Sequence, residues 1–307
     1  MKVSVIVPVF NAGKYVAEAV SSIANQEHVH EIVLVEDGST DKSLLVCEQL
    51  VETHRNVRLF THPNGENRGA GASRNLGVNH ARSDLIAFLD ADDICLPERF
   101  GPPLKELREN PELDGVYEAI GTMFENEAAK ENWKSLGWGN LTTIRKALQP
   151  EELFYYLVTW EAGHFSLNGL LVRKETFLKA GGFNESLKIG EDTDLSIKLS
   201  AVGRLAPGRL TVPVALRRVR EDIWFVKSRN EMLRVRLAGW SATDAWAKKT
   251  RQKRARRLLV GYRLSKVLSK HSRVEQKYPA AIFHVLVSRL MKIEISARRI
   301  VLGASSF

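Results

Sequence analysis

The sequence predicts an α/β fold with a Rossmann-like, mostly parallel β-sheet flanked by helices. Short β-branched runs alternate with helical segments over residues 3–89, which is typical of βαβ units. The apolar run at residues 85–89 is followed at once by Asp90, Asp92 and Asp93. Because open α/β sheets bind ligands beyond the carboxyl ends of their strands, these aspartates are predicted to face a binding crevice.

Strands and helices are expected to alternate through the first third of the chain. Residues 3–10 are β-branched and predict a strand that ends near Pro8, because proline has no N–H for the ladder. Apolar residues then recur at helical spacing across residues 14–25. Further strands are predicted at 31–35, 57–60 and 85–89, and helices at 42–53 (capped by Thr40 or Asp41) and 71–81.

Beyond Pro97 the pattern is less regular, and helices predominate. Helices are predicted at residues 102–109, 151–160, 174–180 and 195–201, and strands at 116–124 and 169–172. Residues 222–307 are predicted to be mostly helical, with helices at 224–237 and 255–268.

The charge of the chain is unevenly distributed. The formal net charge is +9, yet residues 221–307 hold 20 Lys and Arg against 6 Asp and Glu. That segment therefore carries +14 and leaves −5 for the remainder. An acidic body with a basic tail indicates an anionic partner surface, either lipid or nucleic acid.

The composition gives no sign of secretion or of a membrane span. Cys47 and Cys95 lack metal-ligand spacing and do not indicate a disulfide framework, so a reducing compartment is expected. A strand pattern begins at Val3, which leaves no room for a signal peptide, and no apolar run approaches ~20 residues. A cytoplasmic location is therefore expected.

Residues able to bind ligands gather where the predicted strands end. In chain order these motifs are Pro8-Val9-Phe10-Asn11, residues 36–41, Asn67-Arg68-Gly69, residues 73–77, Asp90-Ala91-Asp92-Asp93, Gly181-Gly182-Phe183 and Gly190-Glu191-Asp192. Neighbouring carboxylates repel one another, and a hard divalent cation relieves that repulsion through carboxylate oxygens. For the aspartate motif taken alone, a solvated turn or a helix cap is the alternative.

Two other motifs suit a nucleotide. Asp37 beside Gly38 can accept a hydrogen bond from a base imide or a ribose hydroxyl, and a simple Asx-turn is the alternative. Arg68 and Arg74 lie ahead of or within a predicted helix start, where arginine binds phosphate bidentately and the helix N-terminus favours anions. Surface salt bridges are the alternative for either arginine, and Arg74 is the preferred candidate.

The order of these motifs closely resembles that of the family 2 inverting glycosyltransferases of GT-A fold, over residues 2–219. The resemblance implies a GT-A domain at residues 1–220, with a nucleotide-sugar-binding half at 1–100 and an acceptor half at 101–220. A basic helical C-terminal extension follows at 221–307. The implied activity is transfer of a sugar from a nucleotide-diphosphate donor, expected to be a UDP-sugar, to an acceptor hydroxyl, with inversion. Cell-surface polysaccharide or glycolipid synthesis is the expected setting.

The resemblance also implies roles for individual residues. Asp192 is the expected general base, which takes the proton of the acceptor hydroxyl, with Glu191 as the alternative. Asp92 is expected to bind Mn²⁺ or Mg²⁺ at the donor diphosphate. The implied donor-binding residues are Pro8, Phe10, Asn11, Asp37, Asn67, Arg74, Asp90 and Ala91. The implied acceptor-side residues are Trp160, His164, Asn168, Gly182 and Phe183.

The same residues allow plainer interpretations, and the chain departs from its family at one point. Glu191 and Asp192 could simply be carboxylates favoured at a helix N-terminus, and Trp160, His164 and Asn168 could be packing residues. Many relatives have a histidine where residues 215–220 hold none. The metal would then depend on Asp92, water and the diphosphate, or an arginine would take over part of the charge neutralisation.

The basic run at residues 248–257 is followed by apolar residues and suits an anionic membrane face at the inner side of the cell membrane. A solvated helix face or an oligomer contact is the alternative, and the sequence does not define the oligomeric state. No nucleic-acid partner is expected, since the aromatic interleaving of single-strand binders is lacking. The expected partners are therefore a nucleotide-sugar donor and a saccharide or lipid-linked acceptor.

The sequence gives less support to other classes of protein than to a glycosyltransferase. A nucleotidyltransferase lacks support because no GxGTRxxP-like loop lies near the first strand, and a dehydrogenase lacks support because no GxGxxG follows it. A catalytically degenerate sugar-nucleotide-binding or membrane scaffold protein is the remaining alternative. The presence of Asp90, Asp92 and Asp192 argues against that loss of catalysis.

Overall fold

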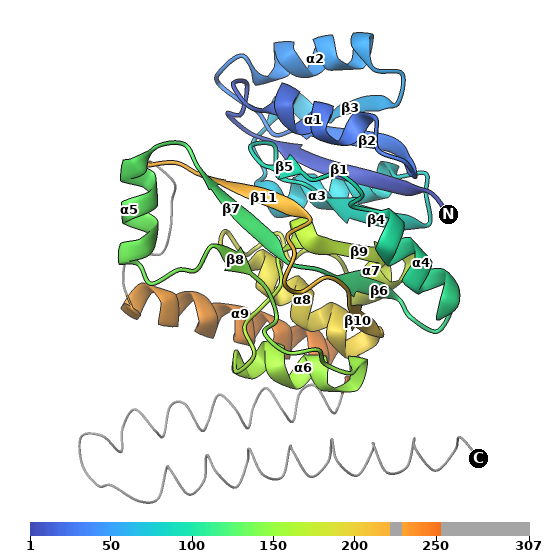
Figure 1. Cartoon of the computed structure of the whole chain (residues 1–307), viewed down its shortest axis with the longest axis vertical. Coiled ribbons are helices and arrows are strands. Elements are labelled where there is room, and N and C mark those ends of the chain that lie inside the picture. The colour runs from blue at the N-terminus through green and yellow to red at the C-terminus, as the bar shows by residue number, and fades with distance from the viewer. Residues whose placement is uncertain (222–228, 253–307) are drawn as a thin grey trace, which may run out of the picture.

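The computed structural model describes residues 1–221 and 229–252, and Figure 1 shows the order of their elements. The strands are β1 (Val3–Val9), β2 (Val29–Glu36), β3 (Val57–Thr61), β4 (Leu85–Phe88), β5 (Ile94–Cys95), β6 (Gly115–Tyr117), β7 (Ile120–Phe124), β8 (Leu141–Thr142), β9 (Leu170–Arg173), β10 (Leu205–Pro207) and β11 (Ala215–Val219). The helices are α1 (Val16–Ala24), α2 (Ser43–Thr53), α3 (Ala70–His80), α4 (Gly101–Glu109), α5 (Glu127–Ser135), α6 (Pro150–Thr159), α7 (Lys174–Ala180), α8 (Glu191–Val202) and α9 (Arg229–Lys249), with short 3₁₀ turns η1 (Pro63–Gly65) and η2 (Leu167–Gly169). The predicted α/β fold is confirmed.

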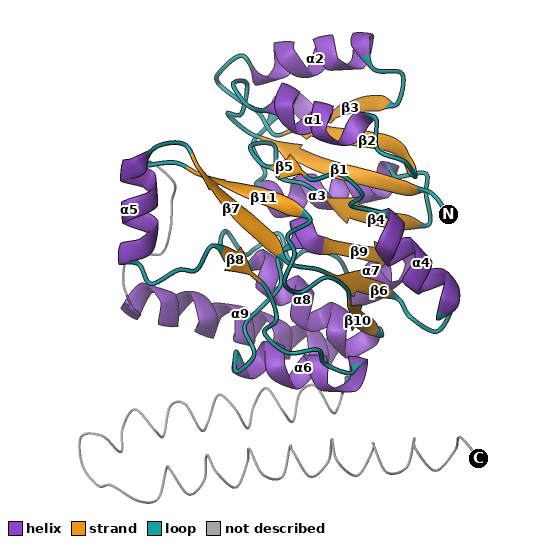
Figure 2. Ribbon diagram, in the orientation of Figure 1, coloured by secondary structure: helices purple, strands orange, loops and turns teal. Residues whose placement is uncertain are grey.

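A seven-stranded sheet forms the centre of the molecule, in the order β10-β6-β9-β4-β1-β2-β3 (Figure 2). Its strands pair in parallel, apart from β9, which runs antiparallel to β4 and β6. The sheet takes strands from residues 1–100 and from residues 101–220, so the two halves share it. The strand order reverses between β1 and β4, and such a switch point is where open α/β sheets bind their ligands.

The two faces of the sheet are covered by different helices. Side chains alternate along each strand, so neighbouring residues of β1 belong to different apolar clusters. Val5 belongs to the cluster that includes residues of α1, α2 and α4, and Ile6 belongs to the cluster on the other face that includes residues of α3, α7 and α8. Helix α1 buries apolar residues at i, i+3, i+4 and i+7, namely Val16, Ala19, Val20 and Ile23. Each fully buried aliphatic side chain contributes about 1.5–3 kcal/mol, and this packing fixes the strand ends that carry the site.

The predicted strand at residues 116–124 is wrong as a single element. Its first part is β6 in the large sheet, whereas its second part is β7 in a separate sheet of order β5-β11-β7-β8. Between them the buried carboxylate of Glu118 accepts hydrogen bonds from Arg99 Nη1 and Arg209 Nε, both at 2.7 Å. The chain changes sheets around this buried charge cluster. Helix α5 and the strands β5, β8, β10 and β11 were not predicted.

Helix α9 packs against α8, and polar contacts join the two. Thr243 Oγ1 donates to Asp194 Oδ1 at 2.7 Å, and Lys198 Nζ lies 2.8 Å from Asp194 Oδ2. Lys198 also donates to the carbonyl oxygen of Gly182 at 2.7 Å. A chain of contacts therefore links α9 to the loop that precedes α8.

The predictions for the C-terminal segment are only partly covered by the structure. Helix α9 includes residues 229–237 of the helix predicted at 224–237, whereas the helix predicted at 255–268 lies outside the described residues. The basic run predicted to contact a membrane is described only from 248 to 252. Across the described chain, no helix combines the length and the apolar character needed to cross a membrane.

Candidate active site

The carboxyl ends of β1, β2 and β4 bring three sequence motifs to one edge of the large sheet. These parallel neighbours lead into Phe10 and Asn11, into Asp37 and into Asp90, respectively. Asn11 Oδ1 accepts the N–H of Thr40 at 2.9 Å, which ties the first motif to the second. Phe10 is 49% exposed, so its ring is open to contact with a flat group. Pro8, next to it, is half-buried.

Asp37 organises the loop that follows η1. Its two carboxylate oxygens accept the backbone N–H groups of Arg68 at 2.7 Å and Gly69 at 2.9 Å. Asn67 Nδ2 donates to the Asp37 carbonyl oxygen at 2.9 Å. Gly38 has a φ of +71°, and a Cβ there would lie 2.5 Å from the carbonyl oxygen of Gly65. Asp37 and Asn67 are thus joined at this edge of the sheet, and their contact with a base stays a prediction.

Arg74 in α3 joins two motifs that are distant in sequence. Its Nη2 donates to Asp90 Oδ1 at 2.7 Å, and its Nη1 donates to Glu191 Oε1 at 3.3 Å. Burial alone lowers the pKa of the Arg74 guanidinium, but the attraction of Asp90 and Glu191 outweighs burial and raises the pKa above its ordinary value. Arg74 is therefore a permanent cation that aligns the aspartate motif with the start of α8.

The loop with Gly182 and Phe183 packs against α3, next to Arg74. Asn75 holds this loop through two hydrogen bonds, accepting the N–H of Phe183 at 2.9 Å and donating to its carbonyl oxygen at 3.0 Å. The Arg74 guanidinium carbon lies 5.4 Å from the centroid of the Phe183 ring. Gly182 and Phe183 are both buried, so in this structure they support Arg74, and an acceptor contact stays a prediction.

The aspartates after β4 have different surroundings. Asp93 is buried, and its carboxylate accepts the N–H of Arg218 at 2.8 Å and Asn168 Nδ2 at 2.5 Å. Asn168 Oδ1 in turn accepts the N–H of Asp90 at 3.2 Å, so this buried amide braces the motif. Burial raises the pKa of the Asp92 carboxyl, and the charge of Asp90 raises it further. A cation beside Asp92 would favour its ionised form.

The aspartates of this motif differ in their partners. The Asp90 side chain is 36% exposed but is bound by Arg74 at 2.7 Å, and Asp93 and Ala91 are buried. The Asp92 side chain is 26% exposed, and the nearest atom of Arg220 lies 3.7 Å from its carboxylate. Within residues 1–221 and 229–252, no group of three or more His, Cys, Asp or Glu side chains could hold a metal. Mg²⁺ at phosphate sites usually takes one or two carboxylates, with phosphate oxygens and water. The site fits such a shared cation and not a cage made by protein alone.

Glu191 and Asp192 are the first two residues of α8, but their side chains lie in different environments. Gly190, with a φ of +79°, turns the chain into the helix. Glu191 faces inward to Arg74, and burial together with the charge of Asp192 raises the pKa of its carboxyl. Asp192 is exposed, and its Oδ1 accepts the N–H of Thr193 at 2.7 Å. Of the two carboxylates, Asp192 is the one exposed to solvent.

Trp160 and His164 form a ring pair at the end of α6. Their ring centroids lie 4.8 Å apart, and Trp160 adopts a left-handed conformation with a φ of +62°. Both side chains are half-buried, and α6 packs against α8, the helix that carries Asp192. This position is compatible with a saccharide contact, which stays a prediction.

Strand β11 adds residues that the motif analysis did not assign. Arg218 Nε donates to the Asp92 carbonyl oxygen at 2.9 Å, and Arg220 Nη2 lies 3.7 Å from Asp92 Oδ2. Both guanidinium groups lie over the ring of Tyr15 at the start of α1, and the sequence signal of Tyr15 was only that of an apolar helix position. An arginine was one of the two alternatives left open by the lack of histidine at residues 215–220. The pairing of β11 with β5 and β7 brings Arg218 and Arg220 to Asp92.

Comparison with known proteins identifies the family. Residues 4–174 match the sequence model of Glycosyl transferase family 2, which is more than half of the chain. The chain therefore belongs to the family 2 glycosyltransferases, as the motif order implies.

Two curated relatives illustrate the similarity. An uncharacterized glycosyltransferase of Haemophilus influenzae is 26% identical over 212 residues, covering 69% of this chain and 66% of the relative. Chondroitin synthase of Escherichia coli is 29% identical over 202 residues, covering 66% of this chain and 27% of that protein. The chain thus spans only part of the length of these relatives.

Solved structures show the same fold. Residues 1–349 of S. aureus TarS in complex with UDP-GlcNAc superpose with a TM-score of 0.62 at 19% identity, covering 94% of this chain and 79% of that one. The complex of the same protein with UDP gives a TM-score of 0.60 at 20% identity, covering 90% and 76%. The fold is that of GT-A glycosyltransferases.

Proposed function

We propose that the chain transfers a sugar from a UDP-sugar to an acceptor hydroxyl, with inversion at the anomeric carbon. The observation that carries this proposal is the Arg74 bridge, which brings the aspartate motif and the start of α8 to one edge of the sheet. A donor diphosphate at Asp92 and an acceptor hydroxyl at Asp192 would then meet there. The TarS complexes with UDP and UDP-GlcNAc support the choice of donor.

The proposed roles follow from position and chemistry. The exposed Phe10 ring and the loop tied to Asp37 would bind the base, and Asp90 would contact the ribose. Asp92, with water and the diphosphate, would hold Mn²⁺ or Mg²⁺, which when bound neutralises charge on the departing nucleoside diphosphate. Asp192 takes the proton as the acceptor hydroxyl attacks from the face opposite the leaving group, and that direction of attack inverts the configuration.

The acceptor is proposed to be a saccharide or a lipid-linked saccharide of a cell-surface polymer. Chondroitin synthase and the minor teichoic acid biosynthesis protein GgaB of Bacillus subtilis, 30% identical over 197 residues, are relatives whose names refer to such polymers. The ring pair of Trp160 and His164 offers apolar faces of the kind that pack on sugars. A peripheral position at the inner face of the cell membrane, through the basic run at 248–257, is part of the same proposal.

Asp92→Ala should abolish the part of UDP stabilisation that depends on manganese. Ligand at 100 times its Kd adds about 2.7 kcal/mol to the free energy of unfolding, so a thermal-shift assay resolves the effect. The wild type should melt higher with UDP and Mn²⁺ than with UDP and EDTA, because Asp90 is already paired with Arg74 and Asp93 is enclosed, which leaves Asp92 to bind the metal. The two melting temperatures should coincide in the variant.

Asp84→Ala is the matched control, since Asp84 is exposed and lies just before β4, at the opposite end of the same strand. It should keep the full manganese effect. A manganese effect that survives in Asp92→Ala would exclude Asp92 as the metal ligand, and a wild type that UDP does not stabilise under any condition would refute the proposed donor.

A further inference from the structure

The carboxylates of Asp90 and Asp93 each accept hydrogen bonds from close neighbours. Arg74 binds Asp90, and Asp93 is satisfied by Asn168 and by the backbone N–H of Arg218. Arg218 itself reaches Glu18 Oε2 at 2.5 Å and the Asp92 carbonyl oxygen at 2.9 Å. Within this cluster, the carboxylate of Asp92 then has the guanidinium of Arg220 as its neighbouring cation.

The contact between Arg220 and Asp92 is loose. Their closest nitrogen and oxygen atoms are 3.7 Å apart, which is beyond hydrogen-bond distance. By contrast, the closest nitrogen and oxygen atoms of Arg74 and Asp90 are 2.7 Å apart. The side chains of Arg220 and Asp92 are 24% and 26% exposed, so solvent reaches both. A gap of this kind can be closed by a second anion, because a guanidinium has several N–H donors in one plane.

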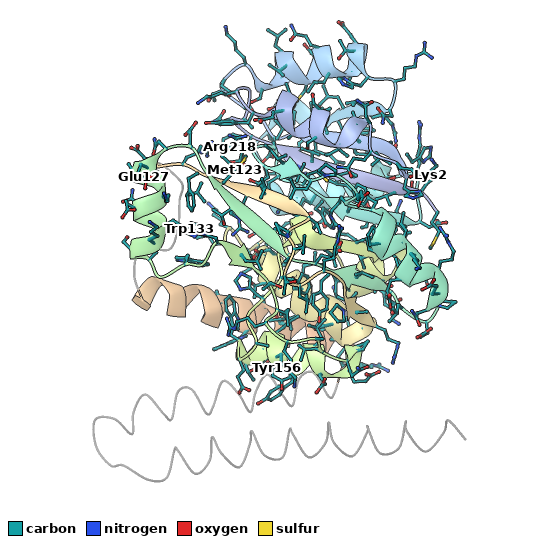
Figure 3. All side chains as sticks on the ribbon, viewed as in Figure 1. Lys2, Met123, Glu127, Trp133, Tyr156 and Arg218 are labelled. Atoms are coloured by element: carbon teal, nitrogen blue, oxygen red, sulfur yellow. The ribbon has the colours of Figure 1, made fainter. Side chains whose placement is uncertain are left out.

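Tyr15 fixes the position of Arg220 at the edge of the site. The guanidinium carbon lies 5.3 Å from the centroid of the Tyr15 ring, and that of Arg218 lies 5.0 Å from the same ring. Residues 218 and 220 are two apart, so their side chains point to the same side of the extended backbone. Figure 3 labels Arg218 beside the smaller sheet, close to the elements of the first third of the chain. The ring thus holds Arg220 over the start of α1, next to Asp92.

We propose that Arg220 is a built-in cationic ligand of the donor diphosphate, which shares with Asp92 the space that a metal would occupy. This inference rests on the proposed function and names a further binding residue of the same site. The diphosphate would accept N–H groups from Arg220, so that binding persists without metal. A metal at Asp92 would add to that binding instead of being required for it.

The guanidinium matters as well as the charge. Arginine can donate two parallel hydrogen bonds to a phosphate while stacking on an aromatic ring, whereas lysine is a strongly hydrated point charge. Arg220→Lys should therefore restore only part of the binding that Arg220→Ala loses. Simple attraction by any positive charge would predict full restoration.

Isothermal titration of the full-length protein with UDP, and separately with inorganic pyrophosphate, tests the proposal. In EDTA, the wild type should bind both probes, and Arg220→Ala should weaken both about 10-fold or more, as expected for loss of a hydrogen bond to a charged group. In saturating Mn²⁺ the loss for Arg220→Ala should be smaller, because manganese can then use Asp92 without competition. The circular dichroism spectrum confirms that each variant is folded.

Arg55→Ala is the charge-matched control, because Arg55 is exposed between α2 and β3, at the amino end of the sheet. It should bind both probes as the wild type does. Equal binding by Arg220→Ala and the wild type in EDTA, or a wild type that binds UDP only with manganese, overturns the inference and leaves the proposed donor standing. Failure of the wild type to bind UDP under any condition overturns the proposed donor as well.

Discussion

Asp192→Asn should lower the turnover number about 10²–10⁴-fold, the usual contribution of a general base, while donor affinity stays within about twofold. Asparagine keeps the size of the side chain and its hydrogen bond to the N–H of Thr193, but it cannot take a proton. Release of UDP in the presence of acceptor measures turnover, and calorimetry with UDP measures donor affinity. Loss of turnover with binding intact is the signature of a residue that acts on the acceptor.

Glu191→Gln separates the two carboxylates that open α8. Glu191 pairs with Arg74, so its loss should weaken donor affinity by disturbing the Arg74 bridge. Turnover at saturating donor should fall much less than in Asp192→Asn. The opposite result, with full turnover in Asp192→Asn and none in Glu191→Gln, would move the general base to Glu191.

Lys198→Met should lower the free energy of unfolding by about 3–5 kcal/mol, the usual cost of breaking a buried ion pair. The side chains of Lys198 and Asp194 are 4% and 1% exposed, and their charged atoms lie 2.8 Å apart. Methionine fills the volume of lysine but leaves the Asp194 carboxylate buried without its cation. The change is measured from the midpoint and slope of urea unfolding.

Lys105→Met provides the control with the same spacing in a helix. Lys105 and Glu109 are also four residues apart, but their side chains are 71% and 58% exposed. The loss there should stay below about 0.5 kcal/mol, because exposed pairs contribute little. Similar losses in the two variants would show that the Lys198–Asp194 pair does not hold the Gly182 loop and α9 to α8.

The part of the fold that carries the donor motifs could be predicted from sequence because each of its signals is local. The strand at residues 85–89 ends in a run of aspartates, and the alternation of strands with helices implies parallel pairing. The parallel pairing of β1 with β2 and β4 then places Asn11, Asp37 and Asp90 at one edge without further information. For these three residues, the position in the site follows from the geometry of the parallel backbone alone.

The second half was harder to predict because its structure depends on contacts between distant segments. The break between β6 and β7 surrounds Glu118, whose two arginine partners lie 19 and 91 residues away. Strands of two or three residues, such as β8 and β10, are too short to show a period. Arg220 reaches Asp92 only because β11 pairs with β5 and β7, and no local pattern specifies that register.

The candidate site shows the same division. The motif order predicted Arg74, Asp90 and Glu191 as site residues, but it could not show that the guanidinium of Arg74 joins both carboxylates. Likewise, the structure shows that Asn168 and Phe183 contact Asp93 and Arg74, and the acceptor contact expected for each stays a prediction. Side chains that support a site carry no chemical signature of their own, so they become visible only in three dimensions.

The most direct test of the central claim is a crystal structure of the protein with UDP and manganese. The account predicts the diphosphate between Asp92 and Arg220, and the uracil beside Phe10. A nucleotide bound anywhere else would contradict it.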